Sequence, residues 1–259
     1  MLGAIAGDII GSVHEHRGTK TTEFDLFAPG CCFTDDTVLA VAVADCLLNG
    51  LDYVDTFHEY FWAYPGVGYG LRFLEWAATR SREPYNSYGN GSAMRVPAVG
   101  HAFDSLDEVL AQAARSAEVT HDHPEGIKGA QATAAAVFMA RHGESKSRIK
   151  DELERMFGYN LDDRLDDLRP RYSFNETCHG TVPAAVIAFL ESRDYEDAVR
   201  KAISLGGDAD TLACITGAVA EAHYGGVPSH IAVRALDMLD DRLRGVLVRF
   251  CERYGIRSA

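Results

Sequence analysis

The sequence predicts an all-α protein that folds as a compact, irregular bundle of helices. Ala and Leu occupy most apolar positions over long stretches, and these stretches end at glycines that suit helix C-termini better than hairpin turns. A chain of 259 residues with 47% hydrophobic content can bury a large core. No Pro/Ser-rich linker or block of charge divides it, so we expect one domain over residues 1–259.

In the first third of the chain, helices are expected over 2–10, 34–48, 52–62 and 69–80. Thr34 is a residue type that caps helix N-termini, and Asn49-Gly50 favours a helix end. Glu83-Pro84 then interrupts the helical pattern before a glycine-rich loop over 85–92. A polar segment over 12–30 is expected to be a loop with functional residues.

In the remainder, Ser105 followed by Glu108 is typical of a capping box and predicts a helix to about residue 117. Pro124 suits the first position of a helix that reaches Arg141. The segment over 145–171 is the most polar part of the chain. It is expected to be a solvent-exposed segment with a helix and an Asp-rich turn. Further helices are expected over 181–192, 195–205, 208–224, 229–239 and 241–254.

Charge and cysteine content exclude several classes of protein. A net charge of −13 and a pI near 5.2 argue against a groove for free polymeric nucleic acid. The six cysteines lack C-x-x-C spacing and are expected to be reduced and mostly buried. The first ten residues carry Asp8 and no basic region, unlike a signal peptide, and no apolar run approaches the ~18 residues of a membrane span. We expect a cytoplasmic protein without membrane contact and, since no coiled-coil seam is visible, a monomer.

Two acidic clusters lie far apart, and each opens an alanine-rich helix: Thr34-Asp35-Asp36 and Asp208-Ala209-Asp210-Thr211. A single cluster of this kind is typical of a helix cap, because Thr and Asp oxygens accept bonds from free backbone N–H groups. Capping, however, uses one side-chain oxygen per helix, whereas these starts together offer four carboxylates and two hydroxyls. Such oxygens are the ligands of Mg²⁺, Mn²⁺ or Ca²⁺, and four crowded Asp side chains are unfavourable without cations. The pattern indicates a site for two hard cations roughly 3.5–4 Å apart.

Other segments are weaker candidates for the same site. Asp8 is either a buried residue bonded to backbone groups or a member of the site, and Glu15 on the following loop is expected to line it as a base or outer metal contact. The loop over 87–92 offers unhindered N–H groups that suit phosphates or ribose hydroxyls, although the same composition is common in ordinary turns.

Two further patterns offer little support for other chemistry. His121-Asp122-His123 lacks a third zinc ligand nearby, so we expect a hydrogen bond from His121 to substrate instead. No G-x-S-x-G elbow occurs, and a thiolate and its base seldom come from adjacent residues such as Cys178-His179. A nucleophilic serine or cysteine is therefore not expected.

In chain order, the motifs are Gly7-Asp8…Glu15, Phe33-Thr34-Asp35-Asp36-Thr37, Ser87-Tyr88-Gly89-Asn90-Gly91-Ser92, Thr120-His121 and Gly206-Gly207-Asp208-Ala209-Asp210-Thr211. This ordered set resembles the ADP-ribosylglycohydrolase family, which includes the dinitrogenase reductase-activating glycohydrolases. The resemblance implies a compact all-helical fold with two Mg²⁺ or Mn²⁺ ions. It also implies hydrolysis of the glycosidic bond between ADP-ribose and a protein side chain, such as arginine or serine, or a small ADP-ribose conjugate.

The resemblance assigns roles by position. Metal binding falls to Thr34, Asp35, Asp36, Asp208, Asp210 and Thr211. ADP-ribose binding falls to Ser87, Tyr88, Gly89, Asn90, Gly91, Ser92 and His121. Glu15 matches an acidic residue near the metals in some members, although His14-Glu15-His16 departs from the usual small-residue-Glu-Phe pattern.

The expected reaction is attack of water on the anomeric carbon of the distal ribose, through an oxocarbenium-like transition state. Asp35, Asp36 or Glu15 would orient the water or take its proton. Three alternatives remain: an ADP-ribose-binding homologue without activity, a structural homologue of the crystallin kind, and a metal-dependent phosphohydrolase.

Overall fold

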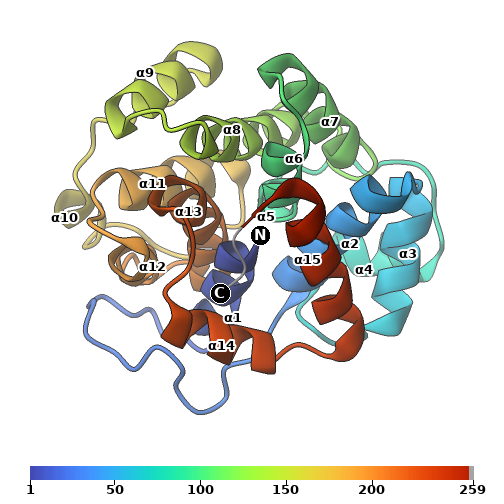
Figure 1. The fold of residues 1–259 in the computed structure, drawn as a ribbon, viewed down its shortest axis with the longest axis horizontal. Coiled ribbons are helices and arrows are strands. Elements are labelled where there is room, and N and C mark those ends of the chain that lie inside the picture. Colours follow the sequence, from blue (N-terminus) through green and yellow to red (C-terminus); the bar gives the residue numbers. More distant parts are fainter. Residues whose placement is uncertain (257–259) are drawn as a thin grey trace.

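The computed structural model describes residues 1–256, and its regular elements there are all helices, which confirms the all-α prediction. They form an irregular bundle (Figure 1), and a single isolated β-bridge joins Gly89 to Thr177. In chain order the helices are α1 Leu2–Gly11, α2 Asp35–Asn49, α3 Tyr53–Ala63, α4 Leu71–Ala78, α5 Gly91–Met94, α6 Pro97–Ala102, α7 Leu106–Glu118, α8 Pro124–Arg141, α9 Lys146–Phe157, α10 Leu165–Leu168, α11 Cys178–Leu190, α12 Tyr195–Ile203, α13 Ala209–Tyr224, α14 Ser229–Asp237 and α15 Asp241–Tyr254.

Most helix ends follow the predicted chemistry. Thr34 accepts a bond from the Asp36 N–H, Ser105 accepts one from the Glu108 N–H, and Gly50 and Gly225 end α2 and α13 with positive φ. The prediction for 69–80 was too long, because Gly70 has an extended backbone and α4 begins only at Leu71. The short helices α5, α6 and α10 were not predicted.

The centre of the bundle is the contact between α1 and α13, which lie side by side. Every residue of α1 is buried, and its glycines face α13. A Cβ atom on Gly7 would lie 2.1 Å from the Ala213 carbonyl oxygen, and one on Gly11 would lie 2.5 Å from the Asp210 Cα. Glycine is therefore required at both positions, and this close approach places Asp8 of α1 near the start of α13.

The long loop between α1 and α2, which carries Glu15, is attached to the segments that follow α10 and α12. The Lys20 ammonium donates to the carbonyl oxygens of Arg169 at 2.8 Å and Tyr172 at 2.6 Å, and also to that of Leu205. Figure 1 shows this loop running along one edge of the molecule past α12. Lys20 thus holds the loop within its length, and the packing of α1 and α2 in the core holds its two ends.

All six cysteines are free thiols, and Cys46, Cys178, Cys214 and Cys251 are buried, as predicted. Within residues 1–256, no helix combines the length and hydropathy that a membrane crossing requires.

Candidate active site

The two acidic clusters meet, because the N-termini of α2 and α13 face each other. The Thr211 hydroxyl donates to Asp36 Oδ2 at 3.2 Å across this junction, and both side chains are buried. The residues are 175 positions apart in the chain. The structure thus brings together the two clusters that the sequence singled out.

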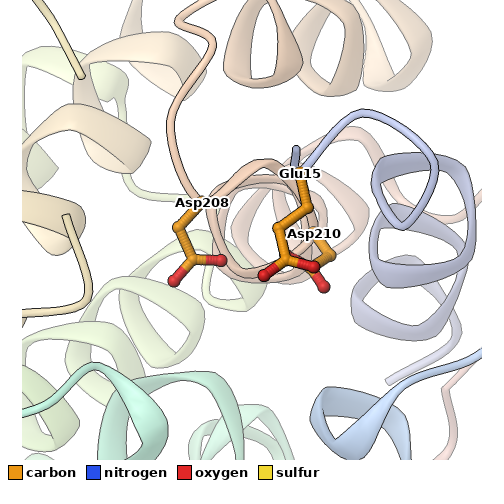
Figure 2. Close-up of side chains that lie close together, drawn as sticks. All are labelled: Glu15, Asp208 and Asp210. Carbon is orange, nitrogen blue, oxygen red and sulfur yellow. The ribbon is translucent and has the colours of Figure 1, made fainter. Parts of the chain in front are cut away.

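Glu15 joins the second cluster. Glu15, Asp208 and Asp210 each offer a carboxylate oxygen, and these oxygens all lie within 4.8 Å of one another. Figure 2 shows Asp208 and Asp210 at the start of α13 and Glu15 entering from the loop, with their carboxylates directed to the same space. The departure from the family pattern around Glu15 therefore does not remove its carboxylate from the site.

Asp8 lies behind the start of α2 and holds it in place. Its carboxylate accepts bonds from the Thr34 N–H at 3.0 Å, the Thr34 hydroxyl at 2.7 Å, the Thr37 N–H at 3.2 Å and the Thr37 hydroxyl. Of the two interpretations of Asp8, the structure supports a buried residue bonded to backbone groups, with two hydroxyls added. Burial raises the pKa of Asp8 to about 6 in spite of these bonds.

A helix-capping role accounts for the position of the Thr34 side chain but not for that of Asp208. Thr34 Oγ1 accepts from the Asp36 N–H at 3.2 Å and donates to Asp8, which leaves one lone pair free for a cation. Asp208 precedes α13 but makes no side-chain capping bond. Its Oδ2 accepts instead from Asn90 Nδ2 at 2.7 Å.

The electrostatics of the cluster fit divalent cations. Burial, followed by neighbouring carboxylates such as Asp8 and Asp208, raises the pKa values of Asp35, Asp36 and Asp210 well above their ordinary range. No Lys or Arg within residues 1–256 forms an ion pair with any of these aspartates. Asp36 Oδ1 is buried without a hydrogen-bond partner. Crowded carboxylates that include an unpaired oxygen and form no ion pair with a Lys or Arg of the described residues are the donor set expected of a hard-metal site.

A cavity of about 370 Å³ opens onto these carboxylates. Its wall includes Thr34, Asp35, Asp36, Asp208, Asp210, Thr211, Glu15, Ser87, Gly89, Asn90, Gly91 and His121. The predicted metal-binding residues and most of the predicted ADP-ribose-binding residues therefore surround one space.

Tyr88 and Ser92 are placed differently from the rest of their loop. Tyr88 is 47% exposed and is not part of the cavity wall. Ser92 is fully buried within the short helix α5, and its hydroxyl donates to the Gly126 carbonyl at 2.7 Å. Ser92 thus ties the loop to α8, away from the cavity.

Sequence reasoning missed several residues of the cavity wall, among them Arg72, Tyr85, Arg95 and Glu176. Arg72 and Glu176 lie on exposed segments without a recognisable motif. Arg95 did carry a signal, because it is the one charged residue in the apolar run from Ala93 to Val99.

The structure also accounts for two rejected alternatives. The Cys178 thiol is buried against the Gly89 carbonyl, and burial raises its pKa to about 12, which is unfavourable for a nucleophile. His123 caps α8 by accepting a bond from the Glu125 N–H at 3.1 Å. Neither residue is part of the cavity wall.

A family model described as ADP-ribosylglycohydrolase matches residues 1–257. The chain belongs to the ADP-ribosylglycohydrolase family. This membership confirms the resemblance seen in the motifs, and the enzyme class is that of the ADP-ribosylglycohydrolases, hydrolases that cleave the glycosidic bond to ADP-ribose.

Individual relatives agree with this assignment. The ADP-ribosylhydrolase ARH3 of Bos taurus is 30% identical, over 87% of this chain and 84% of the relative. The ADP-ribosyl-[dinitrogen reductase] glycohydrolase of Rhodospirillum rubrum is 25% identical, over 86% of this chain and 84% of the relative. Among solved structures, an ADP-ribosylglycohydrolase-related protein complex is 26% identical and superimposes with a TM-score of 0.74, over 97% of this chain and 96% of that chain.

Proposed function

We propose that this ADP-ribosylglycohydrolase is a binuclear-metal enzyme that releases ADP-ribose from a protein side chain, such as arginine or serine, or from a small conjugate. The observation that carries the proposal is the junction of α2 and α13, where carboxylates from both helices face one cavity and form no ion pair with a Lys or Arg of residues 1–256. A crystallin-like structural role would not require this arrangement of buried charge.

The metal ligands we propose come from both sides of the junction. Thr34, Asp35 and Asp36 belong to the start of α2, and Asp208, Asp210 and Thr211 to the start of α13. Two Mg²⁺ or Mn²⁺ ions held there would neutralise the aspartates and supply Lewis acidity toward oxygen atoms of the sugar.

The protein's own groups would then handle binding and the proton. Glu15 is partly exposed at the cavity, and burial together with Asp208 raises its pKa, so its carboxylate is suited to accept a proton from water. Asp35 and Asp36 remain the alternatives for this step. An oxocarbenium-like transition state carries positive charge and would be attracted by the surrounding carboxylates.

The glycine loop and His121 would hold the non-reacting ADP portion. Binding energy from that portion can be used to position the reacting ribose. Gly89 and Gly91 lack side chains where the loop meets His121, so their backbone is open to a ligand in the cavity.

We further propose that residues 1–259 form one domain that acts as a monomer. Free thiols at all six cysteines are consistent with a reducing compartment such as the cytoplasm. The net charge of −13 supports a modified protein or small conjugate as partner in preference to free nucleic acid.

Mass spectrometry of products from defined ADP-ribosyl-arginine and ADP-ribosyl-serine peptides and from O-acetyl-ADP-ribose tests the proposal. Each reaction is run with Mg²⁺, with Mn²⁺ and with EDTA. We expect intact ADP-ribose only when a divalent ion is present, and its loss in the Asp36→Ala and Asp210→Ala variants. Release of AMP or phosphate would identify a phosphohydrolase, and thermal stabilisation by ADP-ribose without any product would identify a binding protein.

A further inference from the structure

Arg95 is a fully buried cation that has no carboxylate partner within residues 1–256. Its guanidinium lies over the Phe57 ring at 4.5 Å and donates to the carbonyl oxygens of Ser116 and, at 3.4 Å, Ala117. These carbonyls belong to the last turn of α7, the end of a helix that favours positive charge. Burying a charge without a counter-ion is costly, so its position calls for a reason beyond packing.

The remaining contact of Arg95 leads toward the cavity. Its Nη2 donates to the Thr120 hydroxyl oxygen at 2.9 Å. Burial lowers the pKa of Arg95 to about 10, so the group stays protonated at neutral pH and can only donate. The Thr120 oxygen must therefore act as the acceptor of this bond.

The same hydroxyl oxygen lies 2.8 Å from His121 Nδ1. Within the described part of the chain, Nδ1 lies at hydrogen-bonding distance from the Thr120 hydroxyl oxygen, and the phenol of Tyr85 is a second polar group beside that hydroxyl. If Thr120 donates to Nδ1, the proton of a neutral imidazole must be on Nε2. Burial, Arg95 and Arg72 together lower the pKa of His121, which keeps the ring neutral.

Nε2 is directed at the ligand loop. A Cβ atom on Gly91 would lie 3.3 Å from Nε2, and one on Gly89 would lie 3.5 Å away. His121 is part of the cavity wall, and no hydrogen bond within residues 1–256 uses Nε2. The hydrogen bonds from Arg95 through Thr120 to His121 thus end in an N–H group beside the two glycines of the loop.

We propose that Arg95 is a positioning residue that acts through the Thr120 hydroxyl to hold His121 in the Nε2–H tautomer. His121 is then a neutral hydrogen-bond donor to an acceptor oxygen of ADP-ribose, and it takes no part in proton transfer. The ligand half of this inference rests on the proposed function, whereas the tautomer is a property of the free protein.

The tautomer is measured by long-range ¹H–¹⁵N correlation spectra of ligand-free protein labelled with ¹⁵N-histidine. The His121 signals are assigned by their absence in His121→Gln. We expect Nε2–H in the wild type and in Thr120→Ser, and a mixture of both tautomers in Thr120→Val and Arg95→Met. Thr133→Val is the matched control, because Thr133 is equally buried and its hydroxyl has no hydrogen bond.

Arg95→Met removes a buried unpaired charge and retains volume, so it can remain folded. If Arg95→Met or Thr120→Val unfolds, the other still tests the positioning role, and the wild type and Thr120→Ser decide the tautomer in either case. An Nδ1–H tautomer in the wild type would overturn the inference, and so would an unchanged tautomer in folded Thr120→Val and Arg95→Met.

Calorimetric titration with ADP-ribose tests the ligand half. Thr120→Val should weaken binding on the order of tenfold, the cost of losing one hydrogen bond to a charged or polar ligand group. In a His121→Gln background the same substitution should cause no further loss, because Thr120 acts only through His121. Additive losses would refute the positioning role. Absence of ADP-ribose binding by the wild type would overturn the proposed function. The tautomer spectra would still test the positioning role of Arg95, because they are recorded without ligand.

Discussion

Replacing Gly7 by alanine should loosen the contact between α1 and α13 on which the site depends. The new Cβ atom would lie 2.1 Å from the Ala213 carbonyl oxygen, whereas an ordinary C···O contact is about 3.3 Å. Both sides of the clash are helical backbone, so no side chain can rotate away and the helices must separate by about 1 Å.

The size of the effect follows from two opposing terms. Overpacking of a tight core costs about 1–3 kcal/mol, and rigid backbone on both sides places Gly7→Ala at the upper end. Alanine recovers at most about 1 kcal/mol through its higher helix propensity. We therefore expect a net loss of about 2 kcal/mol, or a Tm lower by about 4–8 °C for a chain of this size.

Urea and thermal unfolding measure this loss, and Gly245→Ala provides the control. Gly245 lies within α15, and its Cβ atom would meet only the flexible end of Arg249 at 3.4 Å. That variant should be as stable as the wild type or slightly more stable. If Gly7→Ala matched Gly245→Ala in stability, the argument that glycine is required at this contact would be wrong.

Three further results are expected. In thermal shift assays, Mg²⁺ or Mn²⁺ at 100 times Kd should stabilise the wild type by about 2.7 kcal/mol. Asp210→Asn should lose this stabilisation, whereas Asp167→Asn, at an exposed position, should retain it. The second result concerns metal-free protein, in which the pKa values of Asp35, Asp36 and Asp210 are raised above the ordinary aspartate value of 3.8. Above about pH 4 the folded state therefore keeps protons that the unfolded chain has released. The free energy of unfolding should accordingly fall as pH rises from about 4. Urea titrations at several pH values check this slope, which saturating Mg²⁺ should flatten; a rise with pH would contradict the assignment. Iodoacetamide near pH 8 should label the exposed Cys32 and leave the buried Cys178 unmodified, and activity should be retained. Mass spectrometry that finds Cys178 alkylated in active protein would disprove its burial.

Helix positions could be read from the sequence where local chemistry determines them. Pro124 and Arg141 bound α8 as predicted, and Thr34 and Ser105 act as caps, because capping and apolar periodicity depend on neighbouring residues. The helix α6 was missed because six residues carry too little periodicity to predict an element.

The site could be anticipated from its acidic clusters, but the way its parts support one another could not. Asn90 was expected to bind substrate, yet its amide donates to Asp208, 118 positions away. The four bonds to Asp8 come from residues 26 and 29 positions away, and the bond from Arg95 to Thr120 spans 25 positions. Such contacts depend on tertiary packing, which single-sequence patterns do not encode.

The pairing of α1 with α13 has a consequence for folding kinetics. The two helices are separated by about 200 residues, so the contact that buries α1 has a very high sequence separation. Closing so long a loop is entropically expensive and leaves an apolar, glycine-containing segment exposed until late in folding. Refolding should accordingly be slow for an all-helical protein. Mg²⁺ should accelerate it little, because the proposed metal site is assembled only after that closure.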